Sequence, residues 1–175
     1  MTRIAQLVVM GVSGVGKTTI ATRLARRLGC EERDADDFHP PANVAKMSAG
    51  IPLEDADRQP WLLAIAAWLR AHDQKGSTAV VTCSALKRSY RDVLRGASPR
   101  VLFVYLSGRP ELIAERLRSR RGHFMPAALL PSQLAILEPL GPDEPGLTVD
   151  VSAPPDVLAE RIIRDLDLEP AAGGH

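Results

Sequence analysis

Residues 11–18, GVSGVGKT, place glycines, a lysine and a threonine at the spacing G-x-x-x-x-G-K-[ST]. Glycines in this pattern let the chain turn tightly with its amides pointing inward, where a Cβ would obstruct them. Those amides meet phosphate oxygens at a helix N-terminus, where the helix dipole favours negative charge. The lysine reaches the β- and γ-phosphates, and the threonine hydroxyl ligates Mg²⁺. The segment therefore predicts a site for ATP or GTP.

The residues that we expect to contact the nucleotide here are Gly11, Ser13, Gly14, Val15, Gly16, Lys17, Thr18 and Thr19. Lys17 is also expected to be catalytic, because its charge offsets the charge of the transferred phosphoryl group. Thr18 is the expected protein ligand of Mg²⁺.

Such a loop must leave a buried strand and open a helix. Short apolar runs predict strands at residues 4–10, 78–83, 100–106 and 147–151, and the segment 30–34 predicts one more short strand before an acidic cluster. Apolar residues at helical spacing predict helices over 18–28, 57–72, 86–94, 110–118 and 155–166. Strands that alternate with helices predict a parallel α/β sheet with ligands at the carboxyl ends of its strands.

Composition narrows the class of protein. The chain has 175 residues, of which 45% are apolar, enough for one domain with a sizeable core. A formal net charge of +1 gives nucleic-acid binding no support. No apolar stretch approaches the ~18 residues of a membrane span, so we expect a soluble, cytoplasmic protein. Cys30 and Cys83 have no metal-ligand partners at the usual spacing.

Three classes of phosphate-loop protein compete. A regulatory GTPase needs an Asn-Lys-x-Asp segment, but the only asparagine, Asn43, lies in NVAK; the D-x-x-G match at 143–146 falls just before the last strand. A mechanical ATPase would end a central strand in an acidic residue, whereas the run 79–83 is followed by Ser84. A small-molecule kinase needs an acceptor pocket and a basic lid, and this chain has candidates for both.

The acceptor side begins at Asp34 and Asp36. They are two residues apart, so they share one side of an extended segment. We expect Asp34 to help hold Mg²⁺ through water, and Asp36 to orient the acceptor hydroxyl as a catalytic residue. A solvated acidic turn is the alternative.

Four segments then carry a resemblance to a known family. They are DADDFHP at 34–40, NVAKMSAGIPLEDADRQPWL at 43–62, CSALKRSYRDVLR at 83–95, and RRGHFM with SQLAILEPL between 120 and 140. The chain resembles bacterial gluconokinases, which are phosphate-loop kinases similar to shikimate kinase. The likeness covers roughly residues 5–165. The segment after Glu138 departs from the family's usual Leu-Glu-x-Pro, since Pro139 follows at once.

The resemblance implies a three-layer α/β phosphate-loop kinase with a five-stranded parallel sheet in the order 2-3-1-4-5. It implies ATP-dependent phosphorylation of D-gluconate at its C6 hydroxyl, with ATP and Mg²⁺ as cofactors. Members of the family are often dimers, so the resemblance allows a homodimer. One domain would span 1–169, with a mobile lid at about 118–140 and a flexible tail at 170–175.

Gluconate carries a carboxylate and five hydroxyls, so its site needs cations and short polar groups. Arginine forks suit carboxylates, and amides, hydroxyls and imidazole suit hydroxyls. The expected substrate-binding residues are Asp36, His39, Asn43, Arg58, Ser84, Lys87, Arg91 and Gln133. Each has an alternative: Lys87 and Arg91 could be solvated on one helix face, His39 could brace its loop, and Asn43 could cap a helix.

The basic lid contains Arg116 and Arg120, which are four residues apart and share a helical face. We expect both to contact the nucleotide phosphates on closure and Arg120 to be catalytic. Adenine would meet the backbone of the loop 152–155. Shikimate kinase, a nucleoside monophosphate kinase and a regulator that binds nucleotide without turnover stay open as alternatives.

Overall fold

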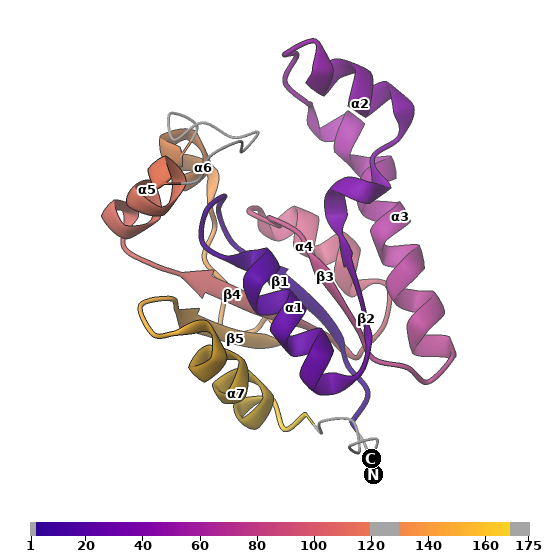
Figure 1. Ribbon diagram of the computed structural model, residues 1–175. Helices are drawn as coiled ribbons and strands as arrows, with labels where there is room; N and C mark the ends of the chain where they lie inside the picture. The colour runs from indigo at the N-terminus through magenta and orange to yellow at the C-terminus, as the bar shows by residue number, and fades with distance from the viewer. Residues whose placement is uncertain (1–2, 120–129, 169–175) are drawn as a thin grey trace.

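The computed structural model describes residues 3–119 and 130–168 of the chain. Its five strands form one sheet (Figure 1). They are β1 (Gln6–Met10), β2 (Glu31–Asp34), β3 (Ala79–Thr82), β4 (Val101–Ser107) and β5 (Gly146–Asp150). All pairings are parallel, in the order β2-β3-β1-β4-β5. The predicted sheet and strand order are confirmed, and each strand lies within two residues of its predicted bounds.

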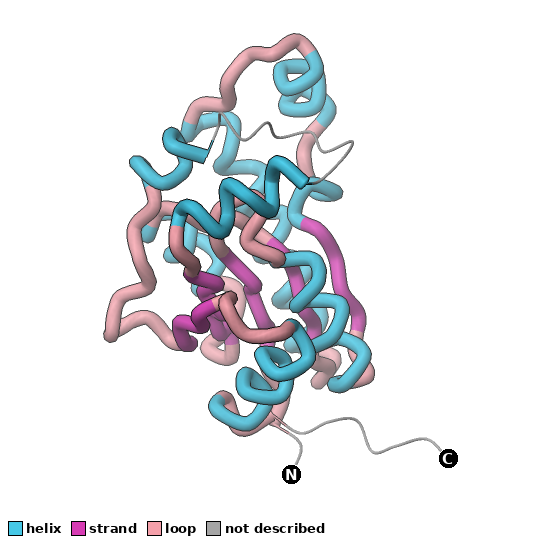
Figure 2. Tube along the Cα trace, turned by 60° about the vertical axis from the view of Figure 1, so that its left-hand side comes forward, coloured by secondary structure: helices cyan, strands magenta, loops and turns pink. Residues whose placement is uncertain are grey.

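Helices cover both faces of this sheet, and Figure 2 shows the strands in magenta with helices around them. The described helices are α1 (Lys17–Leu28), the 3₁₀ helix η1 (Ala35–Phe38), α2 (Pro41–Ser48), α3 (Asp55–Gln74), α4 (Arg88–Arg95), α5 (Pro110–Ser119), α6 (Leu130–Ile136) and α7 (Pro155–Asp165). None of the helices in these ranges is both long and apolar enough to cross a membrane.

Side chains alternate along each strand and divide the core in two. On β1, Leu7 and Val9 pack with α1, α5 and α7, whereas Val8 and Met10 pack with α3 and α4. The runs on β1, β3 and β4 are apolar on both faces because both faces are covered. The molecule therefore has three layers, as expected.

Strand register brings three loops together at one edge of the sheet. Val9 of β1 lies opposite Thr82 of β3, and Thr82 lies opposite Asp34 of β2. The chain leaves each of these strands at nearly the same level, since β1, β2 and β3 are parallel. The amide of Gly11, just after β1, donates to the carbonyl of Ser84, just after β3 (3.3 Å). The chemistry-bearing segments after these strands are therefore neighbours.

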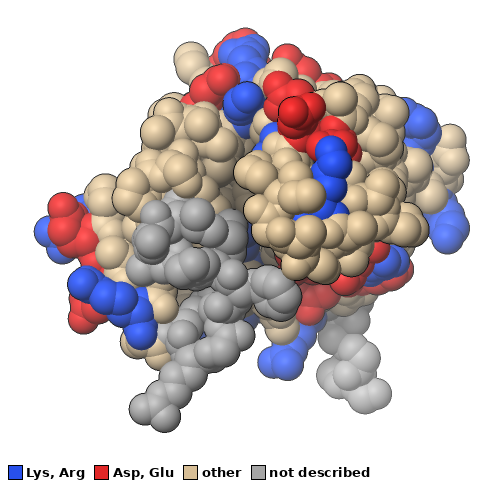
Figure 3. Space-filling view, turned by 90° about the horizontal axis from the view of Figure 1, so that it is seen from above, with Lys and Arg blue, Asp and Glu red and all other residues tan. Residues whose placement is uncertain are grey.

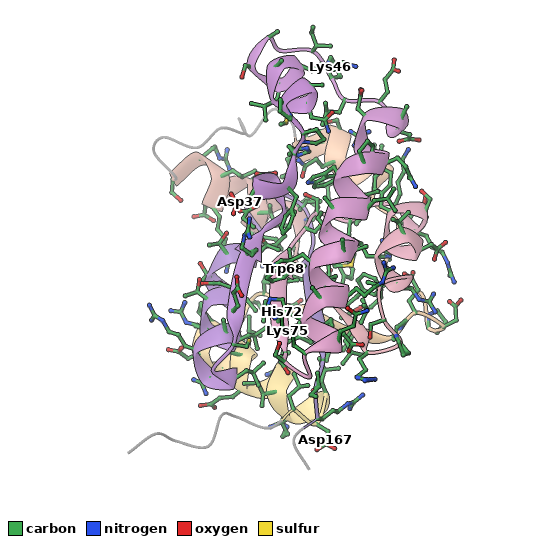
Figure 4. All side chains as sticks on the ribbon, turned by 90° about the vertical axis from the view of Figure 1, so that its right-hand side faces the viewer. Asp37, Lys46, Trp68, His72, Lys75 and Asp167 are labelled. Atoms are coloured by element: carbon green, nitrogen blue, oxygen red, sulfur yellow. The ribbon has the colours of Figure 1, made fainter. Side chains whose placement is uncertain are left out.

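Helix α3 begins two residues before its predicted start because the chain caps it. Glu54 and Asp57 form a capping box, in which each side chain accepts from the other residue's amide. Lys46 of α2 lies with Nζ 2.8 and 2.9 Å from the Asp57 carboxylate oxygens. Lys46 lies in the last turn of α2, away from the sheet (Figure 4). The Asp57 carboxylate thus starts one helix and anchors another.

Candidate active site

The phosphate loop runs from the end of β1 into α1, as its sequence predicts. Gly11 and Gly14 have positive φ angles of 144° and 83°. A Cβ on Gly11 would lie 2.8 Å from the carbonyl oxygen of Leu106, and one on Gly14 would lie 2.5 Å from Cγ of Leu117. Lys17 bends back over the loop, with Nζ 2.8 Å from the Gly11 carbonyl oxygen and 3.2 Å from that of Val12. Tight packing thus fixes the loop against β4 and α5.

A cavity of about 300 Å³ adjoins this loop. Its walls come from α1, α5 and the segment that links β5 to α7. Arg116 of α5 lies in the wall and donates to the carbonyls of Val151 (3.0 Å) and Val15 (3.5 Å). Ala153 and Pro155 also line the cavity. The size and apolar lining suit a nucleoside, and the cavity contains residues of the loop 152–155 that we expected to meet adenine.

Two carboxylates lie on the other side of the phosphate loop. Asp34 ends β2 and caps η1, since its Oδ1 accepts from the Asp36 amide at 2.8 Å. Partial desolvation and then the negative charge of Asp34 raise the pKa of the Asp36 carboxyl, and the charge of His39 when its ring is protonated, together with that of Lys17, opposes the rise. The Asp36 side chain is 83% exposed, so it is open to an incoming ligand. Asp36 therefore lies close enough to Lys17 for their charges to interact.

His39 connects Asp36 to the rest of this side. Its ring stacks on Trp61 at a centroid distance of 4.5 Å and an interplanar angle of 10°. Nε2 lies 3.7 Å from Oδ1 of Asp36, and Nδ1 lies 3.3 Å from the amide nitrogen of Asn43. That same nitrogen donates to the Asp57 carbonyl at 2.8 Å. Burial lowers the pKa of His39, so the ring is neutral near pH 7. Because the amide nitrogen can only donate, Nδ1 accepts and the ring proton lies on Nε2, facing Asp36.

Beyond His39, two cations converge on one carboxylate. Oδ1 of Asp55 lies 3.5 Å from Arg58 Nη1 and 3.7 Å from Lys87 Nζ. It also accepts a hydrogen bond from the Tyr90 hydroxyl at 2.7 Å. The Arg58 guanidinium carbon lies 5.6 Å and Lys87 Nζ 5.5 Å from the centre of the Tyr90 ring. Together these residues form a cation cluster, which we define as Asp55, Arg58, Lys87 and Tyr90.

Figure 3 shows the molecule from above, with a hollow between the side of α5 and α6 and the side of α2 and α3. Blue lysine and arginine atoms are visible within the hollow. Cationic side chains in such a hollow can pair with an anionic ligand.

A gluconokinase from Gluconobacter oxydans is 56% identical to this chain over 163 residues, which is 93% of this chain and 92% of that protein. The chain belongs to the gluconokinase family. A family model described as an AAA domain also matches residues 7–125.

Two solved structures carry the same likeness. A sugar kinase from Janibacter sp. HTCC2649 is 52% identical with a TM-score of 0.89, covering 99% of this chain and 100% of that one. A gluconokinase from Sinorhizobium meliloti 1021 is 43% identical with a TM-score of 0.83, covering 94% of both chains. The phosphate-loop kinase fold of the gluconokinase family is therefore shared along nearly the whole chain.

In this member of the gluconokinase family, Arg91 does not occupy its expected place. Its side chain is fully buried, and Nε and Nη2 lie 2.6 and 2.9 Å from the carboxylate oxygens of Glu144. Nη1 donates to the Ala85 carbonyl at 2.8 Å. All three guanidinium nitrogens therefore already have hydrogen-bond partners within the protein. The prediction that Arg91 binds the substrate is wrong for this structure.

The contacts of Gln133 and Asn43 also differ from those expected. Gln133 of α6 bonds to the phosphate loop: Oε1 accepts from the Ser13 amide at 2.7 Å, and Nε2 donates to Ser13 Oγ at 3.0 Å. Asn43 is buried, and its amide nitrogen serves His39 and the Asp57 carbonyl. The side-chain amides thus position neighbouring protein groups instead of pointing into open space.

The structure describes the positions of Thr18, Thr19 and Ser84, and their binding roles stay predictions. Thr18 is exposed in the first turn of α1, and Thr19 lines the nucleoside-sized cavity. Ser84 stands at the carboxyl end of β3 beside Gly11. Arg120 lies outside the described residues. Among the described residues, no group of three or more His, Cys, Asp or Glu side chains could hold a metal by itself.

Sequence reasoning missed Asp55, Tyr90 and Glu144. Asp55 stands three residues before Arg58, and Tyr90 three residues after Lys87, a helical spacing that could have suggested contact. Nothing comparable marked Glu144, because its partner lies 53 positions away in the chain.

Proposed function

We propose that this chain transfers the γ-phosphoryl group of ATP to the C6 hydroxyl of D-gluconate, giving 6-phospho-D-gluconate and ADP. The observation that carries the proposal is a row of side chains whose neighbours interact through their charges. It leads from Lys17 on the phosphate loop, past Asp36 and His39, to the cation cluster. Gluconate has a reactive hydroxyl at one end and a carboxylate at the other, which matches the two ends of this row.

On the nucleotide side, the cavity beside α1 would take adenine and ribose, and the phosphate loop would take the phosphates. The first turn of an α-helix leaves its amides without acceptors in the helix, which suits a polyphosphate. Lys17 would leave the loop carbonyls for the β- and γ-phosphates, a short movement of a flexible chain. Arg116 would approach the phosphates from α5, and Arg120 would complete a lid at about 118–140.

The donors present also fit Mg²⁺. The exposed Thr18 hydroxyl and the Asp34 carboxylate are oxygen ligands, which Mg²⁺ prefers, and it commonly keeps several waters and takes only one or two protein ligands beside phosphates. Bound there, the ion would neutralise charge on the β- and γ-phosphates. A site of this kind needs no cluster of three acidic side chains.

On the acceptor side, Asp36 would accept the hydrogen bond of the C6 hydroxyl and hold it in line with the γ-phosphate. The transition state of phosphoryl transfer is largely dissociative and asks little of a base. Asp36 therefore acts chiefly through position. His39 supports it by presenting Nε2–H to its carboxylate. Arg58 and Lys87 would bind the gluconate carboxylate, and Ser84 would meet a hydroxyl.

Other acceptors compete on the same scaffold. Shikimate and nucleoside monophosphates are both anions, and a regulator would need no acceptor at all. The test is ADP release with Mg²⁺-ATP and D-gluconate, shikimate, AMP or D-glucose in separate reactions. Stimulation by gluconate alone is the expected result. Stimulation by another acceptor would refute the proposed substrate, and no stimulation would refute catalysis. Lys17→Met is the control for release by a contaminating kinase, because it removes the phosphate-loop charge.

A further inference from the structure

The loop after β3, residues 83–87, carries Ser84 and Lys87 and is held through three successive carbonyls. Gly11 donates to Ser84 O (3.3 Å), Arg91 Nη1 to Ala85 O (2.8 Å), and Glu138 to Leu86 O (2.7 Å). We name residues 83–87 the acceptor loop. Its backbone is fixed from the phosphate loop, from α4 and from the segment after α6.

Ala85 is the strained point of this acceptor loop. Its φ angle is +45°, a conformation that residues other than glycine rarely adopt. Such a residue persists only where its surroundings force it. The Ala85 side chain is buried, and its carbonyl is the one that Arg91 holds. The Arg91 guanidinium is therefore the side-chain group that holds the strained residue between Ser84 and Lys87.

Glu144 fixes that guanidinium. The two side chains are 0% and 1% exposed, and the carboxylate grips Nε at 2.6 Å and Nη2 at 2.9 Å. The Gly141 amide donates to the same carboxylate at 3.1 Å. A buried ion pair is poor evidence of stabilisation, because desolvation offsets its attraction. The bidentate geometry, in contrast, defines where the third nitrogen, Nη1, points.

We propose that Arg91 and Glu144 form a positioning pair, which holds the strained Ala85 and thereby places Ser84 and Lys87 for the acceptor. The pair touches neither nucleotide nor acceptor. It acts through the acceptor loop, and it gives a role to the D-x-x-G stretch that no GTPase switch explains. The inference rests on the proposed function for its kinetic readout.

The main test is the double variant Arg91→Met/Glu144→Leu. Apolar residues of similar volume often replace a buried ion pair without loss of stability, so the variant keeps the fold while it frees the Ala85 carbonyl. We expect KM for gluconate to rise about tenfold or more, because small misplacements in a site cost large factors. KM for ATP should change less than about twofold, since neither side chain lines the nucleotide cavity.

Arg91→Lys is the second variant, in case the double variant does not fold. Lysine keeps the charge for Glu144 but lacks the fork that also reaches Ala85. The matched control is Asp143→Asn. Asp143 pairs with Arg88 and so joins the same two segments as Glu144 and Arg91, but this pair lies on the surface: the Arg88 side chain is 41% exposed and that of Asp143 is 61% exposed. The control should keep wild-type KM for both substrates.

A wild-type KM for gluconate in the double variant or in Arg91→Lys would overturn the positioning role, as would an equal rise in KM for ATP. Amide hydrogen exchange over residues 84–87, measured without substrates, separates this failure from failure of the proposed function. Faster exchange there than in Asp143→Asn supports the positioning pair whichever acceptor the enzyme uses. Unchanged exchange refutes it.

Discussion

Gln133 on α6 occupies the amide of Ser13, with Oε1 2.7 Å from the nitrogen and Nε2 3.0 Å from the Ser13 hydroxyl. The side-chain carbonyl takes the position that a phosphate oxygen would take at a loop amide. A nucleotide that uses this amide must therefore displace Gln133. The contact joins the segment after residues 120–129 to the phosphate loop.

Gln133→Met should consequently bind ATP more tightly. Methionine fills similar space but does not accept the Ser13 hydrogen bond, so no competitor for the amide remains. A neutral hydrogen bond contributes about 1 kcal/mol, which corresponds to about fivefold in the dissociation constant. Titration calorimetry with ATP and Mg²⁺ measures it. Gln133→Glu should bind ATP more weakly, because it puts a negative charge beside the phosphates. Weaker binding in both variants would contradict the prediction and show that Gln133 helps to hold the nucleotide.

Asp36→Asn should lower kcat about a hundredfold or more, because an amide presents one oxygen and a donor where the hydroxyl needs an oriented acceptor. Asp37→Asn is the matched control, since Asp37 is the exposed neighbour that pairs only loosely with Arg33 (3.7 Å). Steady-state kinetics with gluconate and ATP compare the two variants. Near-normal turnover of Asp36→Asn would remove Asp36 from the mechanism.

His39 should make stability depend on pH. Its pKa in the folded protein lies below the ordinary value of 6.5, owing first to burial, with Arg58 adding to the fall and Asp36 and Asp34 opposing it. Between these two pKa values the unfolded chain binds more protons than the folded one. Stability from the neutral ring is therefore complete above pH 6.5 and declines as the pH falls toward the folded pKa.

Thermal unfolding of wild type and His39→Gln from pH 8 to pH 5 tests this. The difference in Tm between the two should shrink as the pH falls below 6.5. A difference that stays constant or grows on acidification would contradict a neutral His39. Subtraction of the variant cancels the other histidines.

Gly146→Ala should be severely destabilising. Gly146 opens β5 with φ +142°, and a Cβ there would lie 1.9 Å from the carbonyl oxygen of Phe103 on β4. Backbone cannot yield as a side chain can, so the loss should exceed about 4 kcal/mol. Gly50→Ala is the comparison, because Gly50 has φ +73° and open space around it; backbone strain alone predicts about 1 kcal/mol. Equal losses in chemical denaturation would mean that the contact with Phe103 is relieved by a small shift of β5.

The sequence predicted the sheet because β1, β3 and β4 are apolar on both faces and each is followed by a helical pattern. It also placed Lys17 and Asp36 correctly beside each other, since strand ends of a parallel sheet meet at one edge. It failed where a polar side chain is satisfied by a distant part of the chain. Arg91 looked like a free cation on a helix, but Glu144 lies 53 residues further on.

The same limit explains Gln133 and Asn43. Local spacing shows that a side chain can donate and accept, but not which groups reach it after folding. Ser13 lies 120 residues from Gln133, and the Asp57 carbonyl lies 14 residues from Asn43. Helix bounds were missed for a different reason: the start of α3 depends on the reciprocal bonds of Glu54 and Asp57, which apolar periodicity does not register.

The stacking of Trp61 on His39 equips the acceptor side with its own optical reporter. The chain has two tryptophans, Trp61 and Trp68. The Trp61 ring lies against His39, and its indole N–H donates to the Ala35 carbonyl, one residue before Asp36. A shift of the Asp36 carboxylate therefore changes the surroundings of the Trp61 indole and with them the intrinsic fluorescence. In a Trp68→Phe variant, binding of gluconate can therefore be followed by the fluorescence of Trp61 alone, without an added label and without turnover.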